Sequence, residues 1–495
     1  MSPGKALPKT ADTILSCNRF NMKYFLLIYL LFLFCCFTTW SQVVTPMPKS
    51  KKNTATKSST VTIRHIIIEG NNITRRSVIL REISIDPGDV ILTDSIPQLT
   101  DEIRLRLFNL QLFNEVEEHT VTVADSGNVI DWYISVKERW YIIPGFSIQY
   151  ADQNFNTWFV KEDHDLRRIT GGITLTDKNF RGNLEQLSVT VQEGYSQGIG
   201  LSYLRPYVNK GQTHGIGFSV LASQGSQAYY NTDSNKLVYA GTYSGPILWR
   251  RFEGGLRYLY RPAYASKHSL RLNYVVYSVN DTILKLNPSY FTNGSTTARY
   301  LELSYRYEYN GVDNWNYSLT GQKIVASEIT RLGFEGINFQ SFAKVEAGIF
   351  RNPLPKWYCD AIFRGRLMYP QDQPYYFRNG LGSQTDYIRG YEYYIIDGTN
   401  YGLVRLDLKR EIFNNTYSIP VKYFTAIPVR IYPKIFADAG YISNPVPGNS
   451  FLNNRLLYSV GIGLDIVTLY DVKFRFEFAW NHLGQNGLYL HFNSE

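Results

Sequence analysis

Residues 381–392 read Leu-Gly-Ser-Gln-Thr-Asp-Tyr-Ile-Arg-Gly-Tyr-Glu, and the rest of the chain can be interpreted around this stretch. It is polar, contains glycine and lies between strand-like segments. Its central cation is Arg389, whose guanidinium is a planar fork that stays charged. If the stretch folds into the lumen of a barrel, Arg389 needs a carboxylate to meet it there. The alternative is an exposed turn with a solvated arginine, and the flanking sequence favours the first interpretation.

The flanking segments alternate between apolar and charged residues with period 2. In residues 301–309, leucine and tyrosine occupy the odd positions, whereas glutamate, serine and arginine occupy the even ones. In residues 472–480, valine, phenylalanine and tryptophan alternate with lysine, arginine, glutamate and alanine. A soluble sandwich also alternates, but it does not usually place arginine and glutamate opposite a continuous aromatic face. In a membrane barrel the apolar face meets lipid and the charged face lines a wet lumen.

Composition supports the same fold class. Aromatic residues make up 15% of the 495 residues and charged residues only 19%. No apolar run after the N-terminus is long enough to span a bilayer as a helix, and helical periodicity ends near Trp140. The remaining residues, roughly 355 at about 22 per strand and turn, predict about 16 strands. We therefore expect a mainly β protein in which residues 139–495 form a closed transmembrane antiparallel β-barrel.

The N-terminus reads as a targeting segment. Lys23 precedes an apolar stretch over residues 24–37, and small residues near Ser41 predict signal-peptide cleavage before Gln42. The signal peptide is thus expected over residues 1–41, with Met22 as an alternative start. A retained helical anchor is less favoured, because about 14 apolar residues are too few to span. Residues 42–60, rich in lysine, serine and threonine, are expected to be a disordered linker.

Residues 61–138 are expected to form a small α/β domain. The predicted order is a strand over 61–69, a short helix capped by Thr74, a helix over about 94–110, and strands over 116–123 and 129–136. The longer helix is indicated by apolar residues at intervals of three and four. Turns at Gly70 and after Asp86 separate these elements.

Several kinds of chemistry are not expected. Cys17, Cys35 and Cys36 fall in or before the signal peptide, so only Cys359 remains in the mature chain. This excludes a disulfide framework and a cysteine-based metal site, and no metal or other cofactor is expected. The net charge of +9 is spread out, without the basic and aromatic block of a nucleic-acid site. Gly194–Gly198 matches Gly-x-Ser-x-Gly, but it joins two period-2 strands and is expected to be a hairpin turn, not a nucleophile elbow.

With signal peptide, α/β domain and barrel in this order, residues 61–495 resemble the bacterial outer-membrane assembly and translocation superfamily. This group includes BamA, TamA and the two-partner-secretion transporters. Residues 61–138 resemble a single polypeptide-transport-associated (POTRA) domain. Residues 388–391 match the superfamily's loop motif of valine or isoleucine, arginine, glycine and phenylalanine or tyrosine. The resemblance implies that this loop folds into the lumen and that its arginine pairs with acids on following strands.

Two acids have the parity that such pairing requires. Asp407 alternates with lipid-side apolar residues, and Asp438 resembles the acid of the superfamily's Phe-x-Asp-x-Gly strand motif, which ends here at Gly440. The predicted lumenal lock comprises Arg389, Gly390, Tyr391, Asp407, Asp438 and Gly440.

The resemblance also implies function and partners. POTRA domains have an open strand edge to which extended polypeptides can add by backbone pairing. The candidate edge includes Val116, Thr120 and Val121. We expect a non-enzymatic outer-membrane protein that assists insertion or export of polypeptide clients, with lipid around the barrel and periplasmic or lipoprotein partners. The alternative function is a passive, porin-like channel whose POTRA domain docks a partner.

Overall fold

The computed structural model describes residues 59–123, 128–150, 165–242, 245–382, 386–421, 424–468 and 472–492. The predicted signal peptide and almost all of the predicted linker lie outside these ranges. Within them, none of the helices has the length and apolar character needed to cross a membrane.

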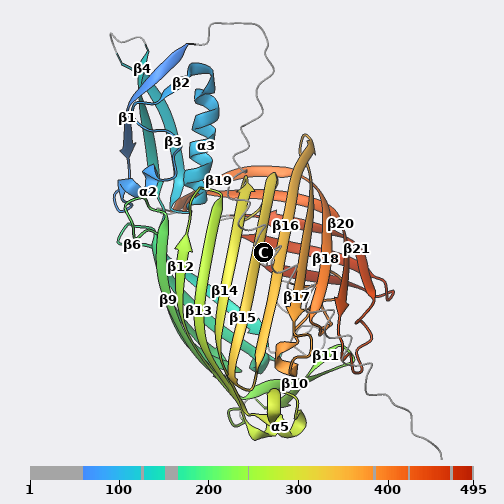
Figure 1. The fold of residues 1–495 in the computed structure, drawn as a ribbon. Coiled ribbons are helices and arrows are strands. Elements are labelled where there is room, and N and C mark those ends of the chain that lie inside the picture. Colours follow the sequence, from blue (N-terminus) through green and yellow to red (C-terminus); the bar gives the residue numbers. More distant parts are fainter. Residues whose placement is uncertain are drawn as a thin grey trace, which may run out of the picture. The chain divides into compact units, whose positions relative to one another are not determined.

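The N-terminal domain is a four-stranded sheet covered by helices (Figure 1). Its elements are β1 (Thr60–Glu69), α2 (Arg76–Leu80), β2 (Val90–Leu92), a 3-10 turn (Thr93–Ser95), α3 (Ile96–Asn109), β3 (Phe113–Thr122) and β4 (Val129–Glu138). The strand order is β2-β1-β4-β3, with β1 and β4 parallel, so β3 lies at one edge of the sheet. Ile63, Ile103 and Trp132 are fully buried in the core between the sheet and α3.

Two local predictions for this domain are wrong. The short strand β2 was not expected, because three residues give no measurable periodicity. Thr74 does not cap α2: the N-cap position is Arg75, and no side chain caps the helix. The Thr74 hydroxyl lies 2.8 Å from the Tyr141 hydroxyl and accepts a hydrogen bond from Asn179 Nδ2 at 2.9 Å. The buried Thr74 side chain therefore hydrogen-bonds to residues that come later in the chain. Sequence periodicity does not reveal such contacts.

The described strands that follow β4 form the closed antiparallel barrel that was predicted, apart from a short two-stranded ribbon (Figure 1). Neighbouring strands follow the chain, and β23 lies beside β5 to complete the ring. The strands are β5 (Ile142–Tyr150), β6 (Ile169–Phe180), β7 (Glu185–Gly194), β8 (Ser196–Arg205), β9 (His214–Gly225), β12 (Trp249–Tyr260), β13 (Ser266–Val279), β14 (Thr297–Val312), β15 (Gly321–Glu335), β16 (Phe339–Leu354), β17 (Trp357–Tyr369), β18 (Asn400–Arg410), β19 (Phe413–Val421), β20 (Phe424–Ser443), β21 (Leu456–Val467), β22 (Lys473–Asn481) and β23 (Asn486–Phe492).

The barrel has 16 strand positions, in agreement with the prediction. β18 and β19 follow one another along the same side of the long strand β20, so the 17 assigned strands occupy 16 places. Side chains alternate as expected: Val404 and Leu406 are 38% and 47% exposed, whereas Arg405 between them is 5% exposed. In this part of β18 the apolar side chains therefore face outward and the charged one faces inward.

Smaller elements connect the strands. A two-stranded ribbon of β10 (Gln227–Asp233) and β11 (Lys236–Gly241) lies between β9 and β12, and α5 (Asp281–Leu286) follows β13. The remaining short elements are 3-10 turns at Leu166–Arg168, Thr292–Gly294 and Tyr375–Phe377. α5 is an exception to the expected absence of helices, and it is capped by the Asn280 side chain, which accepts from the Thr282 amide. The segment around Ser196 joins β7 to β8 as a hairpin turn, without the helix that a nucleophile elbow requires.

Candidate functional site: a lumenal loop, a sheet edge and a domain junction

The segment between β17 and β18 folds back against the inner face of the barrel. Leu381 and Ile396 form a bridge that closes the loop on itself. Ile388 and Tyr391 are 2% exposed and pack with Leu457 of β21 and other apolar side chains. The loop is thus held by an apolar core of its own, which presents Arg389 to the strands beside it.

Arg389 meets three carboxylates. Its Nε donates to Asp438 Oδ2 at 3.0 Å, and its terminal nitrogens lie 2.5 Å from Asp438 Oδ1, 2.7 Å from Asp407 Oδ1 and 3.3 Å from Glu477 Oε1. The Arg389 backbone amide also donates to Asp438 Oδ2 at 3.0 Å. The guanidinium lies 4.0 Å from the centre of the Phe436 ring. A buried charge with this many charge-assisted partners is strongly fixed in position.

The three carboxylates are shared with further cations. Lys434 Nζ lies 2.7 Å from Glu477 and also 2.7 Å from a further acid, Asp465. Lys409 Nζ lies 3.6 Å from Asp407, and Arg405 Nε lies 3.9 Å from Asp438. We call Arg389, Asp407, Asp438, Glu477 and Lys434 the lumenal cluster. Because Arg389 contacts all three acids, losing this single cation leaves several acids short of charge compensation.

The residues beside Arg389 shape the turn. Gly390 has a φ of +88°, which favours glycine, and its amide donates to Glu392 Oε2 at 2.7 Å. Its carbonyl accepts from Asn481 Nδ2 at 2.7 Å. The Tyr391 hydroxyl donates to the Tyr458 carbonyl at 3.1 Å. These contacts tie the loop to β21 and β22.

Gly440 makes room for the loop. A Cβ at this position would lie 2.6 Å from Ile388 Cδ1 and 3.3 Å from the Gly402 carbonyl oxygen. The absence of a side chain at Gly440 therefore lets Ile388 pack directly on the inner face of β20. All six residues predicted for the lock line the contact between this loop and the wall.

Glu477 belongs to this cluster but was not predicted as a partner of Arg389. Its inward position follows from the alternation in residues 472–480, yet nothing in the sequence aligns β22 with the loop. The register places Glu477 opposite Gly463 of β21, which in turn pairs with Lys434 of β20. This neighbourhood depends on the register of three strands, and single-sequence reasoning does not supply it.

A cavity of about 300 Å³ adjoins the cluster inside the barrel. Among its lining residues, eight are arginine or lysine and four are aspartate or glutamate. Within the described ranges, no group of histidine, cysteine and carboxylate side chains has the arrangement to hold a metal ion. The cavity is therefore polar and has more basic than acidic side chains along its lining.

The candidate client edge lies on β3. Val121 pairs with Asp131 of β4, and the Val123 amide donates to the Val129 carbonyl at 2.9 Å. Because amides alternate in direction along a strand, the Thr120 amide and carbonyl point away from β4, toward the free edge. Val116 is 8% exposed and belongs to the domain core, so only its backbone is available to a client.

Glu118 lies on the same strand, facing α3. Burial raises the pKa of Glu118 to about 7, although the hydrogen bond that Trp132 Nε1 donates to Glu118 Oε2 at 3.0 Å acts in the opposite direction. The edge strand thus contains a carboxylate that is costly to ionise.

A second buried charge group joins the N-terminal domain to the barrel. Glu82, whose side chain is fully buried, accepts two hydrogen bonds from Arg261, at 2.6 and 2.9 Å, and one from the Tyr207 hydroxyl at 3.2 Å. Arg81 donates to the Gln212 carbonyl at 2.8 Å. We call Glu82, Arg81, Tyr207 and Arg261 the junction cluster. Its barrel members lie in the turns β8–β9 and β12–β13, so these turns mark the domain end of the barrel.

The neighbours of Arg261 favour its charged form. Burial alone would lower the pKa of Arg261, but Glu82 and Tyr207 outweigh burial and raise it. A further contact comes from the β6–β7 turn, where the Gly182 carbonyl accepts from the Arg75 amide at 2.9 Å. Gly182 has a φ of +74°, and a Cβ there would lie 2.1 Å from the Ile73 carbonyl oxygen. None of these contacts was predicted from the sequence.

Comparison with known proteins agrees with both parts of the fold. Residues 61–139 match the POTRA family model, described as surface antigen variable number repeat. The chain has the fold of BamA from Haemophilus ducreyi lacking POTRA domains 1–3, with a TM-score of 0.50 and 15% identity over 87% of this chain and 83% of that one. The chain thus combines a segment that matches the POTRA domain with a barrel that has the fold of the BamA barrel. The expected fold class and the resemblance to this group are thereby confirmed.

Two further solved structures are similar over most of the chain. CdiB from Acinetobacter baumannii has a TM-score of 0.48 and 13% identity, over 87% of this chain and 73% of that one. CdiB from Escherichia coli has a TM-score of 0.47 and 10% identity, over 91% and 92%. No curated protein matches the sequence. The expected localisation, a bacterial outer-membrane barrel with a periplasmic POTRA domain, agrees with the domain match and the fold.

Proposed function

We propose that this protein assists the insertion or export of polypeptides at the bacterial outer membrane, and that the β3 edge of its POTRA domain receives the extended client. The observation that carries the proposal is the outward-facing backbone of Thr120 on an edge strand, in a domain joined to a membrane-type barrel. Backbone pairing accepts many sequences, because it depends on main-chain hydrogen bonds rather than on particular side chains. That property suits a receptor for unfolded clients.

The lumenal cluster supports the same function by fixing the barrel interior. Arg389 holds its loop against Asp407, Asp438 and Glu477, so the loop occupies the lumen in one arrangement. The proposed lock keeps the barrel wall ordered while clients enter from the periplasmic side. Partner lipoproteins would bind the POTRA domain, and lipid would surround the barrel.

A pair of variants at Thr120 tests client capture. Thr120→Pro removes the outward amide donor while sparing the hydrogen bonds between β3 and β4, which come from alternate residues. Thr120→Ala removes the side chain and keeps the donor. With a photo-crosslinker at exposed Val121 of the full-length protein, we expect the proline variant to lose most crosslinks to an unfolded outer-membrane polypeptide. The alanine variant should keep them, and equal crosslinking in both variants would refute capture by strand addition.

A passive channel is the second candidate function, and the charged lumenal cavity of about 300 Å³ favours it. A channel of this kind would conduct ions steadily in planar bilayers, independently of the Thr120 variants. Steady conductance together with no acceleration of client insertion would favour the channel.

A further inference from the structure

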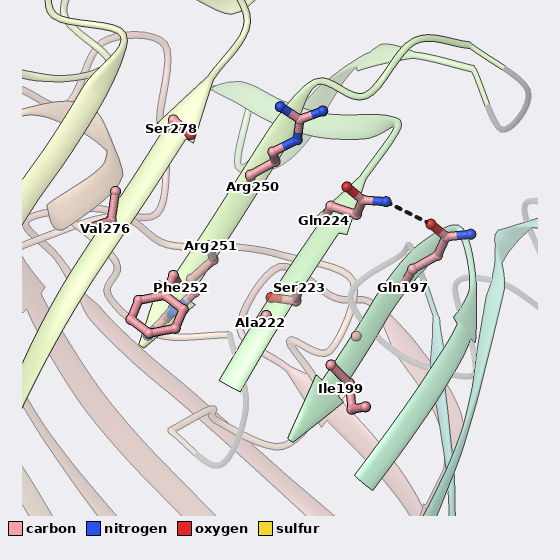
Figure 2. A pocket seen from close by; sticks show the side chains of 11 residues that line it. Gln197, Ile199, Ala222, Ser223, Gln224, Arg250, Arg251, Phe252, Val276 and Ser278 are labelled. Atoms are coloured by element: carbon pink, nitrogen blue, oxygen red, sulfur yellow. Dashed lines mark hydrogen bonds between the residues drawn. The ribbon is translucent and has the colours of Figure 1, made fainter. Parts of the chain in front are cut away.

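The outer face of β8, β9, β12 and β13 carries a groove of about 450 Å³ (Figure 2). Its position on the lipid-facing side follows from exposure, because Ile199 and Phe252 are 61% and 44% exposed. Ala222 forms the floor between these two larger side chains, since Ile199 and Phe252 both pair with it. The volume falls within the range of about 300–1,000 Å³ that is usual for ligand sites.

The groove consists of two rows of side chains that the strand register defines. Strand pairing aligns one apolar row, which consists of Ile199, Ala222, Phe252 and Val276. Two residues further along each strand, pairing aligns a polar row, which consists of Gln197, Gln224, Arg250 and Ser278. Figure 2 shows Arg250, Gln224 and Gln197 at one end of the groove, with Phe252, Ala222 and Ile199 nearer the other. A ligand that fills both rows must have an apolar part and a polar part.

The polar row lies at the barrel end opposite the junction cluster. Tyr260, at the domain end of β12, stacks on His214 in a girdle of aromatic rings. From Tyr260 to Arg250 the strand runs about 34 Å, which is about 26 Å along the membrane normal at a tilt of about 40°. The apolar band of such barrels is about 25 Å tall. Arg250 therefore lies at headgroup level on the far side of the membrane.

Arg250 gives the groove its charge. It is exposed, and none of the ion pairs found between described residues includes it. Gln224 Nε2 donates to Gln197 Oε1 at 3.0 Å, and Gln197 Nε2 donates to Glu193 Oε1 at 2.8 Å. Glu193 lies three strands away from Arg250, about 14 Å at the usual strand spacing, and does not neutralise it. A guanidinium fork at a membrane surface suits a phosphate group.

We propose that this groove binds one phosphate-bearing lipid of the outer leaflet, with an acyl chain over Ala222 and the phosphate on Arg250. The occupant is a lipid and not a soluble anion, because the apolar row continues directly from the cation. The proposal rests on the orientation in the proposed function, with the POTRA domain in the periplasm. It does not depend on client transport.

Lipid titration of the purified full-length protein, followed by native mass spectrometry in detergent, tests the site. The probes are diphosphoryl lipid A and the same lipid with its phosphates removed. Arg250→Gln should weaken binding of the phosphorylated lipid about tenfold and leave the dephosphorylated lipid unaffected. Ala222→Phe should weaken both lipids by filling the groove, and as an apolar change on a lipid-facing surface it should leave the barrel folded.

Arg299→Gln is the matched control. Arg299 lies opposite Val276 on the neighbouring strand β14, but its charge is already paired with Glu335 at 3.3 Å. The Arg299→Gln variant should bind both lipids as tightly as the unaltered protein does. Equal binding of the two lipids by the unaltered protein would overturn the proposal, as would equal effects of the Arg250 and Arg299 variants or displacement of the lipid by inorganic phosphate. Heat-modifiable migration on gels verifies that each variant is folded, and client insertion reports separately on the proposed function.

Discussion

The lumenal cluster and the junction cluster each stabilise a buried charged group, but the central group is a cation in the first and a carboxylate in the second. In the lumen one cation, Arg389, is surrounded by three carboxylates, whereas at the junction one carboxylate, Glu82, is held by Arg261 and the Tyr207 hydroxyl. Both central groups are buried and would be costly if left unpaired. The lumenal cluster joins a loop to strands within one barrel, and the junction cluster joins two domains. We therefore expect the first to control barrel stability and the second to control domain coupling.

Replacing Arg389 should have the largest effect. Arg389→Ala leaves Asp407, Asp438 and Glu477 without their shared cation, which should cost about 3–5 kcal/mol of barrel stability. Urea unfolding of the barrel in detergent measures this loss. The loss of barrel stability for Arg389→Lys should be smaller than that for Arg389→Ala, because the charge is kept. It should still be measurable, because an ammonium cannot reproduce the bidentate contact with Asp438. Arg271→Ala, at an exposed arginine of β13, is the control, and an equal effect there would show that the cluster has no special role.

Replacing Glu82 should affect attachment of the domain without affecting stability of the barrel. Glu82→Gln should weaken attachment of the POTRA domain by about 2–3 kcal/mol, the value of hydrogen bonds to a charged group, with little change in barrel unfolding. A double-mutant cycle with Arg261→Gln, read out by protease cleavage between the domains, measures the coupling. Additive effects of the two substitutions would mean that the pair does not join the domains.

Packing at Gly440 tests whether the lumenal loop is held by shape as well as by charge. Gly440→Ala places a methyl group 2.6 Å from Ile388 Cδ1, and such overpacking should cost about 1–2 kcal/mol in the barrel urea assay. Ile388→Val removes Cδ1, so the double variant should recover most of the loss. If Ile388→Val gives no recovery, the strain lies elsewhere, such as at the Gly402 carbonyl.

Replacing Glu118 should have the smallest effect on stability. Glu118 differs from Glu82 because its hydrogen-bond partner is Trp132 and not an arginine. The pKa of Glu118 is raised to about 7 in the folded domain. The folded state therefore binds this proton more tightly than the unfolded state, and the resulting stability is lost as pH rises through about 7. Glu118→Gln should stabilise the domain by roughly 1 kcal/mol near pH 8, after allowance for solvent screening, and change little near pH 4.

Hydrogen exchange of β3 and β4 in the full-length protein measures the effect of Glu118→Gln. The control is Glu117→Gln on the exposed face of the same strand, which should show no pH-dependent gain. A gain that is the same at both pH values would mean that ionisation of Glu118 is not its cause.

The same comparison shows what could be predicted from the sequence. Asp407 and Asp438 were predicted as lumenal because alternation along a strand assigns each residue to a face, and the loop motif supplied the arginine. Glu477 was assigned to the correct face but not to Arg389, because alternation gives a side chain's face and not its neighbours across several strands. Strand count was predictable for a similar reason, since it depends on average spacing and not on register.

The junction could not be predicted in this way. Glu82 meets Tyr207 and Arg261 from positions 125 and 179 residues away, and the partners lie in turns where no periodicity applies. The lipid groove was missed for another reason. Arg250 is an ordinary exposed arginine until pairing aligns it with Gln224 and places Ala222 beneath it. Contacts that depend on which turns and registers coincide require the fold itself.

The most direct test of the proposed function is the rate at which an unfolded outer-membrane polypeptide inserts into liposomes containing the full-length protein. We expect insertion to be faster than in empty liposomes, slowed by Thr120→Pro and unaffected by Thr120→Ala. An insertion rate equal to that of empty liposomes, together with steady ion conductance, would contradict this account and favour a passive channel.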